Sequence, residues 1–258
     1  MGLKPLARAA VAAATIISMS TPLSSVQAGG RAPSTVTQGD TPSATAACPQ
    51  PQSYEEIYSK PAAAATGVRA EWQLRTASAP DWAAGGHTNT TVWLGTDGDP
   101  NTWVEVGVTA GFHGENTYAF YSAHQYWTGS RYAYQDVKIG KAAVLGRIPM
   151  FSVYKSGSVF RGDVTDTAGS AGIGWSGHTL PAQDYNIGVE YTCPASSRLD
   201  RTYVMTNQYQ RQSDGVWVNA TTGSLDPSGI SGTGVKWCNQ PRTFRFYVHS
   251  QTDTTPCL

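Results

Sequence analysis

Apolar and polar residues alternate with a period of two through most of the chain beyond residue 65. In residues 68–75, for example, every second side chain is apolar, which is the pattern of a strand with one buried face. Turn signals such as Asp97-Gly98 and Ser156-Gly157 separate such segments. Many short strands without helices between them predict an all-β sandwich or barrel. The other predicted strands are residues 91–96, 103–110, 117–127, 144–155, 158–165, 185–192, 201–211, 216–220 and 243–250.

One short helix is predicted at the start of the folded region. Ser53 and Glu56 have the spacing of a capping box, in which the serine caps the first turn and the glutamate bonds back to its amide. Ile57 and Tyr58 follow as the first apolar residues of this helix.

The first 47 residues divide into two segments by composition. Residues 1–28 have Lys4 and Arg8 before an apolar run and end in the small-x-small site Val26-Gln27-Ala28, which predicts a cleaved signal peptide. Residues 29–47 contain almost no large apolar side chain, so we expect a flexible linker, with a removable pro-segment as the alternative. A single domain is then expected over residues 48–258, with no membrane span in the mature chain.

Composition and cysteine usage agree with a secreted, extracellular protein. Charged residues make up 14% of the 258 positions and the formal net charge is zero, which argues against a nucleic-acid partner. Four cysteines in an oxidising compartment predict two disulfides, for which three pairings exist. Cys193–Cys238 with Cys48–Cys257 is favoured, because the two ends of a sandwich often lie close together. No spacing of cysteines and histidines indicates a metal, and no cofactor is expected.

The strand at residues 103–110 has the most informative pattern. Its valines form one buried stripe, which leaves Trp103 and Glu105 on the opposite face. A carboxylate between a tryptophan and Gly107 suits a cleft, although a solvated glutamate on an outer face would have the same pattern.

The next strand, residues 117–127, has aromatic residues on both faces. We expect one of these faces to share a concave cleft with Glu105, since rows of aromatic side chains stack against sugar rings and extended peptides. The residues of this face are Phe120, Ser122, His124 and Tyr126. Together with Trp103 of the preceding strand, they are the predicted ligand-binding residues. A register shifted by one residue would instead bring Gln125 to the cleft.

Four short motifs, taken in order, resemble the secreted glutamic peptidases called eqolisins. They are Val92-Trp93-Leu94-Gly95-Thr96-Asp97-Gly98, then Glu105-Val106-Gly107-Val108, then Ala119-Phe120-Tyr121, then Asp136-Val137-Lys138-Ile139-Gly140. The resemblance covers about residues 91–165. It implies a concanavalin A-like jelly roll of antiparallel sheets.

The resemblance also implies catalytic positions, and this sequence departs from them. The catalytic glutamine of the family falls on Glu105, and its catalytic glutamate falls on Ser122, or on Gln125 if the register slips. Prolyl peptidases of the neprosin type, a related secreted family, use two glutamates, and Glu190 could be the second one here. A nucleophilic triad of Ser122, His124 and Glu105 is disfavoured, because residues two apart on a strand lie roughly 7 Å from each other.

Two functions therefore remain open from the sequence. The first is an aromatic-lined cleft that binds an extracellular glycan or an extended peptide. The alternative is an acid-acting hydrolase of the glutamic-peptidase type that uses Glu105. The face occupied by a few residues around Glu105 decides between them.

Overall fold

The structure is a computed structural model that describes residues 53–59, 65–79, 82–112, 115–192, 198–221, 223–227, 234–239, 243–248 and 256. The predicted signal peptide, the predicted linker and Cys48, Cys193 and Cys257 lie outside these residues, so export and the disulfide pairing stay predictions. Cys238 lies half-buried on a strand near the end of the chain. All strand pairs in the described residues are antiparallel, and the only helical element there is a 3₁₀ turn, η1 (Trp82–Ala84).

The site-bearing layer is a sheet of seven strands, here named sheet A. Its spatial order is β15 (Ser224–Pro227), β1 (Ser53–Ser59), β11 (Pro181–Tyr191), β4 (Thr88–Thr96), β5 (Asp99–Phe112), β6 (Glu115–Trp127) and β7 (Tyr132–Lys138).

Two further sheets complete the fold. Sheet B has the order β10 (Gly169–Trp175), β9 (Val159–Asp166), β8 (Met150–Ser156), β2 (Ala65–Glu71), β13 (Gln208–Arg211) and β14 (Trp217–Asn219). The smaller sheet C has the order β16 (Gly234–Asn239), β17 (Thr243–Val248), β12 (Arg198–Val204) and β3 (Ala77–Ser78).

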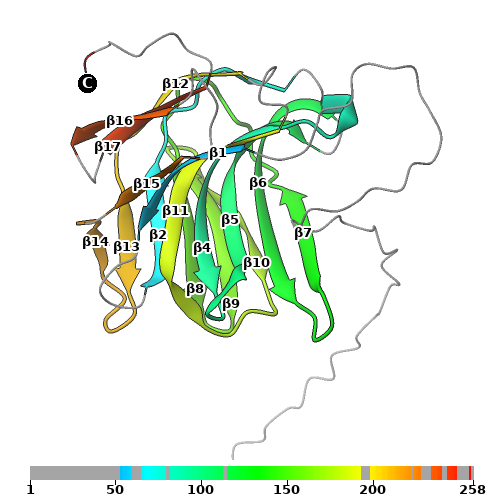
Figure 1. The fold of residues 1–258 in the computed structure, drawn as a ribbon, viewed down its shortest axis with the longest axis vertical. Coiled ribbons are helices and arrows are strands. Elements are labelled where there is room, and N and C mark those ends of the chain that lie inside the picture. Colours follow the sequence, from blue (N-terminus) through cyan, green and yellow to red (C-terminus); the bar gives the residue numbers. More distant parts are fainter. Residues whose placement is uncertain are drawn as a thin grey trace, which may run out of the picture.

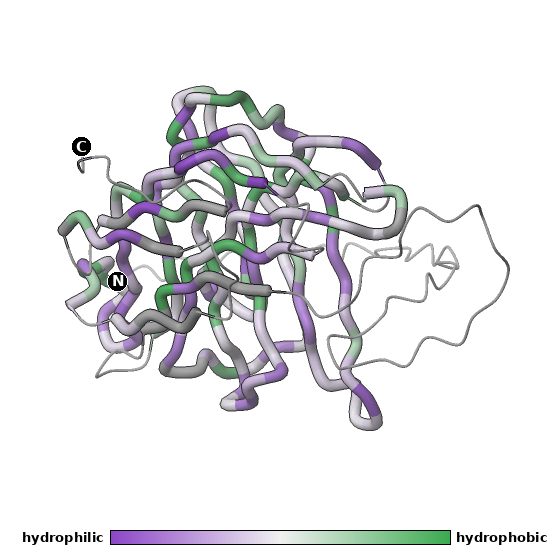
Figure 2. The backbone as a smooth tube through the Cα atoms, turned by 45° about the horizontal axis from the view of Figure 1, so that its top comes forward, coloured by the Kyte–Doolittle hydropathy of each residue, from purple (hydrophilic) through white to green (hydrophobic). Residues whose placement is uncertain are grey.

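Sheets A and B pack face to face, so the predicted all-β sandwich is confirmed. β4 and β5 lie over β8 and β9 (Figure 1). The core between them is built from the apolar stripe of each strand. Hydrophobic and hydrophilic positions are interspersed along the same strands, as alternation requires (Figure 2). The fully buried inner residues of sheet A include Val92, Leu94, Val104, Val106, Ile187 and Val189.

The predicted N-terminal helix is wrong, because residues 53–59 form strand β1. The strand pairs along its length with β11 on one side and with β15 on the other. Two neighbouring strands satisfy the backbone amides that a capping box would otherwise satisfy, and they bury Ile57 completely. Tertiary pairing here overrides a local capping signal.

The predicted turn at Asp97-Gly98 is confirmed. Asp97 and Gly98 both have positive φ angles, 59° and 68°, as a tight hairpin between β4 and β5 requires. The predicted strand at 201–211 is two strands, β12 and β13, which belong to different sheets. β7 and β10 were not predicted as strands; both are largely polar or glycine-rich and lie at the edges of their sheets.

β4 and β5 approach closely at Gly107. A Cβ atom built there would lie 2.2 Å from the carbonyl oxygen of Thr90 and 2.7 Å from Cβ of Thr91, contacts that no side chain tolerates. Because both partners are on the neighbouring strand, a larger residue would push β4 away from β5.

We therefore expect Gly107→Ala to destabilise the protein by about 2 kcal/mol through overpacking. Gly140→Ala is the matched control, because a Cβ at Gly140 meets no atom within 4 Å; its effect should stay within about 0.5 kcal/mol. Urea unfolding monitored by tryptophan fluorescence measures both. Equal stability of the two variants would contradict the close packing at Gly107.

Candidate functional site

The register of β5 against β6 places Glu105 and Gln125 on the same face of sheet A. Glu105 lies opposite Ala123, and Trp103 lies opposite Gln125. Glu105 and Gln125 are therefore diagonal neighbours, at about 7–8 Å between Cα atoms. Their face points away from sheet B, yet Glu105 and Gln125 are only 2% and 3% exposed.

The predicted common face of Glu105 with Phe120, Ser122 and His124 is thus wrong. These three residues lie opposite Val108, Val106 and Val104, so they point into the space between the sheets and are buried there. Ser122 donates a hydrogen bond to the backbone oxygen of Glu105 (2.8 Å) and accepts one from the Trp175 indole (2.8 Å). These contacts are structural, and they separate Ser122 from the Glu105 side chain by the sheet itself.

Tyr126 also belongs to the inner face. Its ring stacks on His124 at 4.6 Å between centroids, and His124 in turn stacks on Trp175 at 4.2 Å. Of the five predicted ligand-binding residues, only Trp103 shares the face of Glu105.

The strands on the other side of β5 bring two further side chains into the row of Glu105. Trp93 of β4 lies opposite Glu105, and Asn186 of β11 lies opposite Trp93. Two strand spacings separate Glu105 from Asn186, or about 10 Å between Cα atoms. A carboxylate and an amide therefore flank Trp93, and a second amide, that of Gln125, lies diagonally beyond Glu105.

Aromatic side chains shield this row from solvent. Trp93, Trp103, Tyr121 and Ala123 form a second buried cluster on the outer face, against which Phe112 and Tyr134 pack. Burial, with the negative charges of Glu105 and Glu190 adding to it, raises the pKa of Tyr121 well above its usual value. Tyr121 thus keeps its proton, and both glutamates lie near its hydroxyl.

Glu190 shares the outer face but lies farther from the row of Glu105. It is opposite Asn89, four residues along β11 from Asn186, so its Cα is roughly 16 Å from that of Glu105 by strand geometry. Its carboxylate is buried and lies 3.6 Å from Nε2 of His87. Glu190 is thus a second buried acid on the outer face, and its role as the second glutamate stays a prediction.

A cleft of about 230 Å³ opens beside the Glu105 row, toward the hairpin of β4 and β5. Gly95, opposite Trp103, leaves its floor without a side chain. The other residues that line it are Glu56, Trp93, Pro100, Asn101, Trp103, Gln125, Asp184, Tyr185 and Asn186.

The two amides of the cleft are held in fixed orientations. Gln125 donates its Nε2 to the backbone oxygen of Asn101 (2.7 Å), and Asn186 donates its Nδ2 to the carboxylate of Glu56. Because both partners can only accept, the NH₂ end of each amide must face them. The amide oxygens are left on the opposite side, where neither accepts a hydrogen bond from the described part of the protein.

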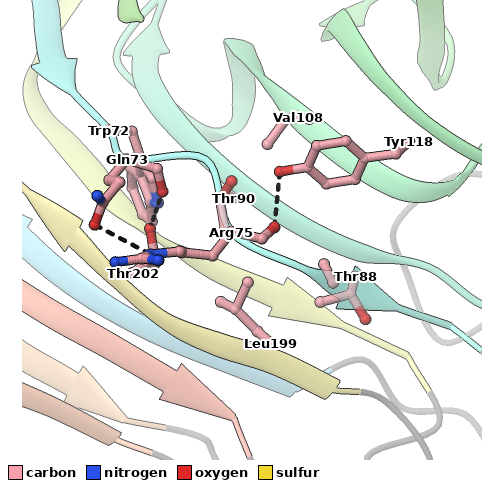
Figure 3. Close-up of a pocket in the computed structure, with 10 residues that line it drawn as sticks. Trp72, Gln73, Arg75, Thr88, Thr90, Val108, Tyr118, Leu199 and Thr202 are labelled. Carbon is pink, nitrogen blue, oxygen red and sulfur yellow. Dashed lines mark hydrogen bonds between the residues drawn. The ribbon is translucent and has the colours of Figure 1, made fainter. Parts of the chain in front are cut away.

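A second hollow, between sheets A and C, is closed. It is bounded by Trp72, Arg75, Tyr118 and Thr202, and the Tyr118 hydroxyl donates to the backbone oxygen of Arg75 across it (Figure 3). No space for a water-sized molecule remains inside. The outer face of sheet A is therefore the better location for a ligand.

No helix in the described ranges is long and apolar enough to cross a bilayer. Among those same residues, no three histidine, cysteine, aspartate or glutamate side chains are grouped so that they could hold a metal ion.

Solved structures of scytalidoglutamic peptidase share this arrangement of strands. One, in complex with a peptide-based transition state analogue, superposes with a TM-score of 0.53 and 13% identity over 76% of this chain and 98% of that chain. Another, with a transition state analogue inhibitor, gives 0.51 and 14% over the same shares. The chain therefore shares the fold of these peptidase structures. The predicted distant resemblance is confirmed at the level of fold, whereas no protein-family model and no curated protein matches the sequence.

Sequence reasoning missed Trp93 and Asn186 as site residues. Trp93 belongs to one of the motifs found in the sequence, but only the pairing of β4 with β5 shows that it lies opposite Glu105. Asn186 alternates with Ile187 and Val189 along β11, so the same period of two that identified Glu105 could have identified it.

On the inner face, His124 belongs to a buried chain of hydrogen bonds. His124 Nδ1 lies 3.0 Å from His178 Nε2, His178 Nδ1 lies 2.7 Å from the Thr96 hydroxyl, and His124 Nε2 lies 3.1 Å from Oε1 of Gln135. When both rings are neutral, Thr96 can donate to His178, His178 to His124, and His124 to Gln135. Asp97 Oδ2 lies 3.3 Å from the His178 Nδ1 atom that accepts from Thr96, and it can accept from this atom only when the atom carries a proton. A proton added to His124 Nδ1 would be set against the Nε2–H of His178, whereas a proton added to His178 Nδ1 would face the Asp97 carboxylate.

Burial lowers the pKa of His124 to about 4, and it lowers that of His178 although the nearby Asp97 opposes the shift. The unfolded chain titrates near pH 6.5, so between about pH 6.5 and 4 it binds more protons than the folded protein. The free energy of unfolding therefore falls as the pH drops from about 6.5 to 4. Above pH 6.5 these histidines do not change the free energy of unfolding.

We expect the free energy of unfolding to decrease between pH 6.5 and 4 by about 3 kcal/mol through His124 alone. His124→Phe, which retains the stacking, should make this decrease smaller, whereas the matched variant Tyr126→Phe should leave it as in the parent protein. Urea unfolding at several pH values measures the slopes. An unchanged slope in His124→Phe would refute the assignment.

Proposed function

We propose that this chain is a peptide hydrolase of the glutamic-peptidase type, with Glu105 as its general base. The observation that carries the proposal is the shared outer face of Glu105 and Gln125, with a cleft beside it. A carboxylate that activates water and neighbouring amide or indole N–H groups that stabilise an oxyanion are the minimal parts of this chemistry.

In the proposed reaction, Glu105 accepts a proton from a water molecule whose oxygen attacks the scissile carbonyl carbon. The carbon–oxygen bond forms as the carbonyl becomes an oxyanion. Glu105 then returns the proton to the amide nitrogen, the carbon–nitrogen bond breaks, and an acid and an amine leave. The carboxylate ends the cycle as it began, so no other reactant is needed.

The oxyanion needs a donor that is already oriented and dry. Trp93 supports this role, since it faces Glu105 and its indole N–H is buried and donates to no acceptor among the described residues. The second amide hydrogen of Asn186 or Gln125 is a further donor on either side. Tyr121, whose raised pKa keeps its proton in place, adds no negative charge to the site.

A second candidate is a cleft that binds an extended peptide or a glycan without cleaving it. The amide contacts favour this reading, because Gln125 and Asn186 each already use one N–H on a protein acceptor. For either function we propose action outside the cell, on the basis of the predicted export signal. We prefer the hydrolase to the binding cleft, because a ligand held by stacking alone gives the buried carboxylate of Glu105 no role.

Cleavage of a denatured protein at pH 4 to 7 tests the proposal. We expect Glu105→Gln to lower kcat/KM at least about a hundredfold, since the amide cannot accept the proton of water. Glu115→Gln, at an exposed acid paired with Lys138, is the control and should retain full activity. Cleavage that survives Glu105→Gln would reassign the base, and absence of cleavage by the parent protein would leave the binding cleft as the function.

A further inference from the structure

Tyr121 has a buried hydroxyl group to which the proposed reaction gives no task. The residue is 2% exposed, and its hydroxyl has no partner at hydrogen-bond distance among the described residues. A buried hydroxyl without a partner destabilises a fold, so its presence calls for another explanation.

One row of side chains on the outer face of sheet A separates Glu105 from Glu190. Across β11, β4, β5 and β6, the members of this row are Gly188, Thr91, Gly107 and Tyr121. Glu105 lies two residues before Gly107 on β5, and Glu190 lies two residues after Gly188 on β11, on the other side of the row. Neighbouring strands are about 4.8 Å apart, less than the length of a tyrosine side chain, so the hydroxyl of Tyr121 can extend over β5 between the two acids.

The two glutamates act on this hydroxyl electrostatically. Burial first, and then the negative charges of Glu105 and Glu190 in that order, raise the pKa of Tyr121 well above its usual value. The hydroxyl therefore keeps its proton, and this proton turns toward the negative charge.

Other titratable side chains surround Tyr121, and those with recorded contacts are directed elsewhere. Tyr134 donates to Asp136 (3.1 Å), and Lys138, opposite Tyr121 on β7, donates to Glu115 (2.8 Å). The remaining ones are Glu56 of β1, which accepts from Asn186, and His87, which lies beside Glu190.

Of the two acids, Glu105 is the one that Tyr121 serves. It lies on the strand next to Tyr121, whereas Glu190 lies two strands farther across the sheet and has Nε2 of His87 at 3.6 Å. The charge of Glu105 also acts on the hydroxyl more strongly than that of Glu190.

We propose that Tyr121 is a positioning residue of the proposed hydrolase, whose hydroxyl dipole holds the carboxylate of Glu105 in its ionised form. An O–H dipole in a dry, low-dielectric environment acts on a charge beyond the distance of a hydrogen bond. Only the ionised carboxylate can accept a proton from water. This role rests on the proposed function, because it is as the base that Glu105 needs its charge.

The titration of Glu105 tests this role without requiring turnover. The glutamates are labelled with ¹³C at the carboxyl carbon, and the NMR signal of Glu105 is identified by its loss in Glu105→Gln. We expect Tyr121→Phe to raise the midpoint of this titration by about half a pH unit to one unit, because the ionised carboxylate loses the dipole that stabilises it. Titrations between about pH 4 and 8 that coincide in the parent protein and Tyr121→Phe would overturn the proposal.

A second measurement separates this role from a purely structural one. Phenylalanine retains the ring and its contact with Phe112, at 6.4 Å between centroids, and removes only the hydroxyl. We therefore expect the urea midpoint of unfolding at pH 7 to be at least as high in Tyr121→Phe as in the parent protein.

Tyr154→Phe is the matched control for the titration. It removes a hydroxyl that donates to the carboxylate of Asp163 (2.6 Å) on the other sheet, so it should leave the midpoint of Glu105 unchanged. A shift as large as that of Tyr121→Phe would show that the effect is not local and would overturn the proposal.

The proposed function and the role of Tyr121 can fail separately. If the parent protein cleaves no peptide but the midpoint of Glu105 rises in Tyr121→Phe, the hydrolase fails and the effect of Tyr121 on the charge of Glu105 stands. If cleavage depends on Glu105, the acid limb of kcat/KM should move to higher pH in Tyr121→Phe by the same amount as the midpoint. An acid limb at the parent pH would refute the positioning role and leave the hydrolase in place.

Discussion

The pairing of β5 with β6 is the constraint on which the site depends. Because side chains alternate across a strand, a single register decides whether Glu105 shares a face with Gln125 or with Ser122 and His124. Between these two strands, Ser122 of β6 bonds to the backbone oxygen of Glu105 from the inner face, and on the other side of β5 the bare Gly107 allows β4 to approach closely. A carboxylate and an amide thus face outward because a serine and a histidine are held inward.

Much of this fold follows from alternation, and the decisive detail does not. The valines of β5 were sufficient to place Glu105 on the face opposite the core. For β6 the alternation of apolar residues does not distinguish the two faces, because Phe120 and Tyr121 point to opposite faces and both are fully buried. Sheet A is covered on both sides, by sheet B within and by an aromatic layer outside, so apolarity could not identify the inner face of β6. Only pairing, which is a property of two strands together, resolves it.

The outer aromatic layer also explains how a glutamate on an outer face can be chemically useful. A carboxylate on an open sheet would be solvated, and the high dielectric constant of water would weaken its electrostatic interactions with other groups. Trp103 and Tyr121 belong to the aromatic cluster that shields Glu105 from solvent, and the cleft at Gly95 lies beside it.

The two faces of β6 place opposite demands on pH. A glutamic-peptidase reaction is proposed for mildly acid conditions, yet His124 on the inner face must stay neutral for its contacts with His178 and Gln135. Residue 124 lies between Ala123 and Gln125, so loss of the inner hydrogen bonds would release the strand that positions the amide beside Glu105. With its pKa lowered to about 4, the His124 ring stays neutral down to that value, but the folded protein loses stability as the pH falls from 6.5 toward 4.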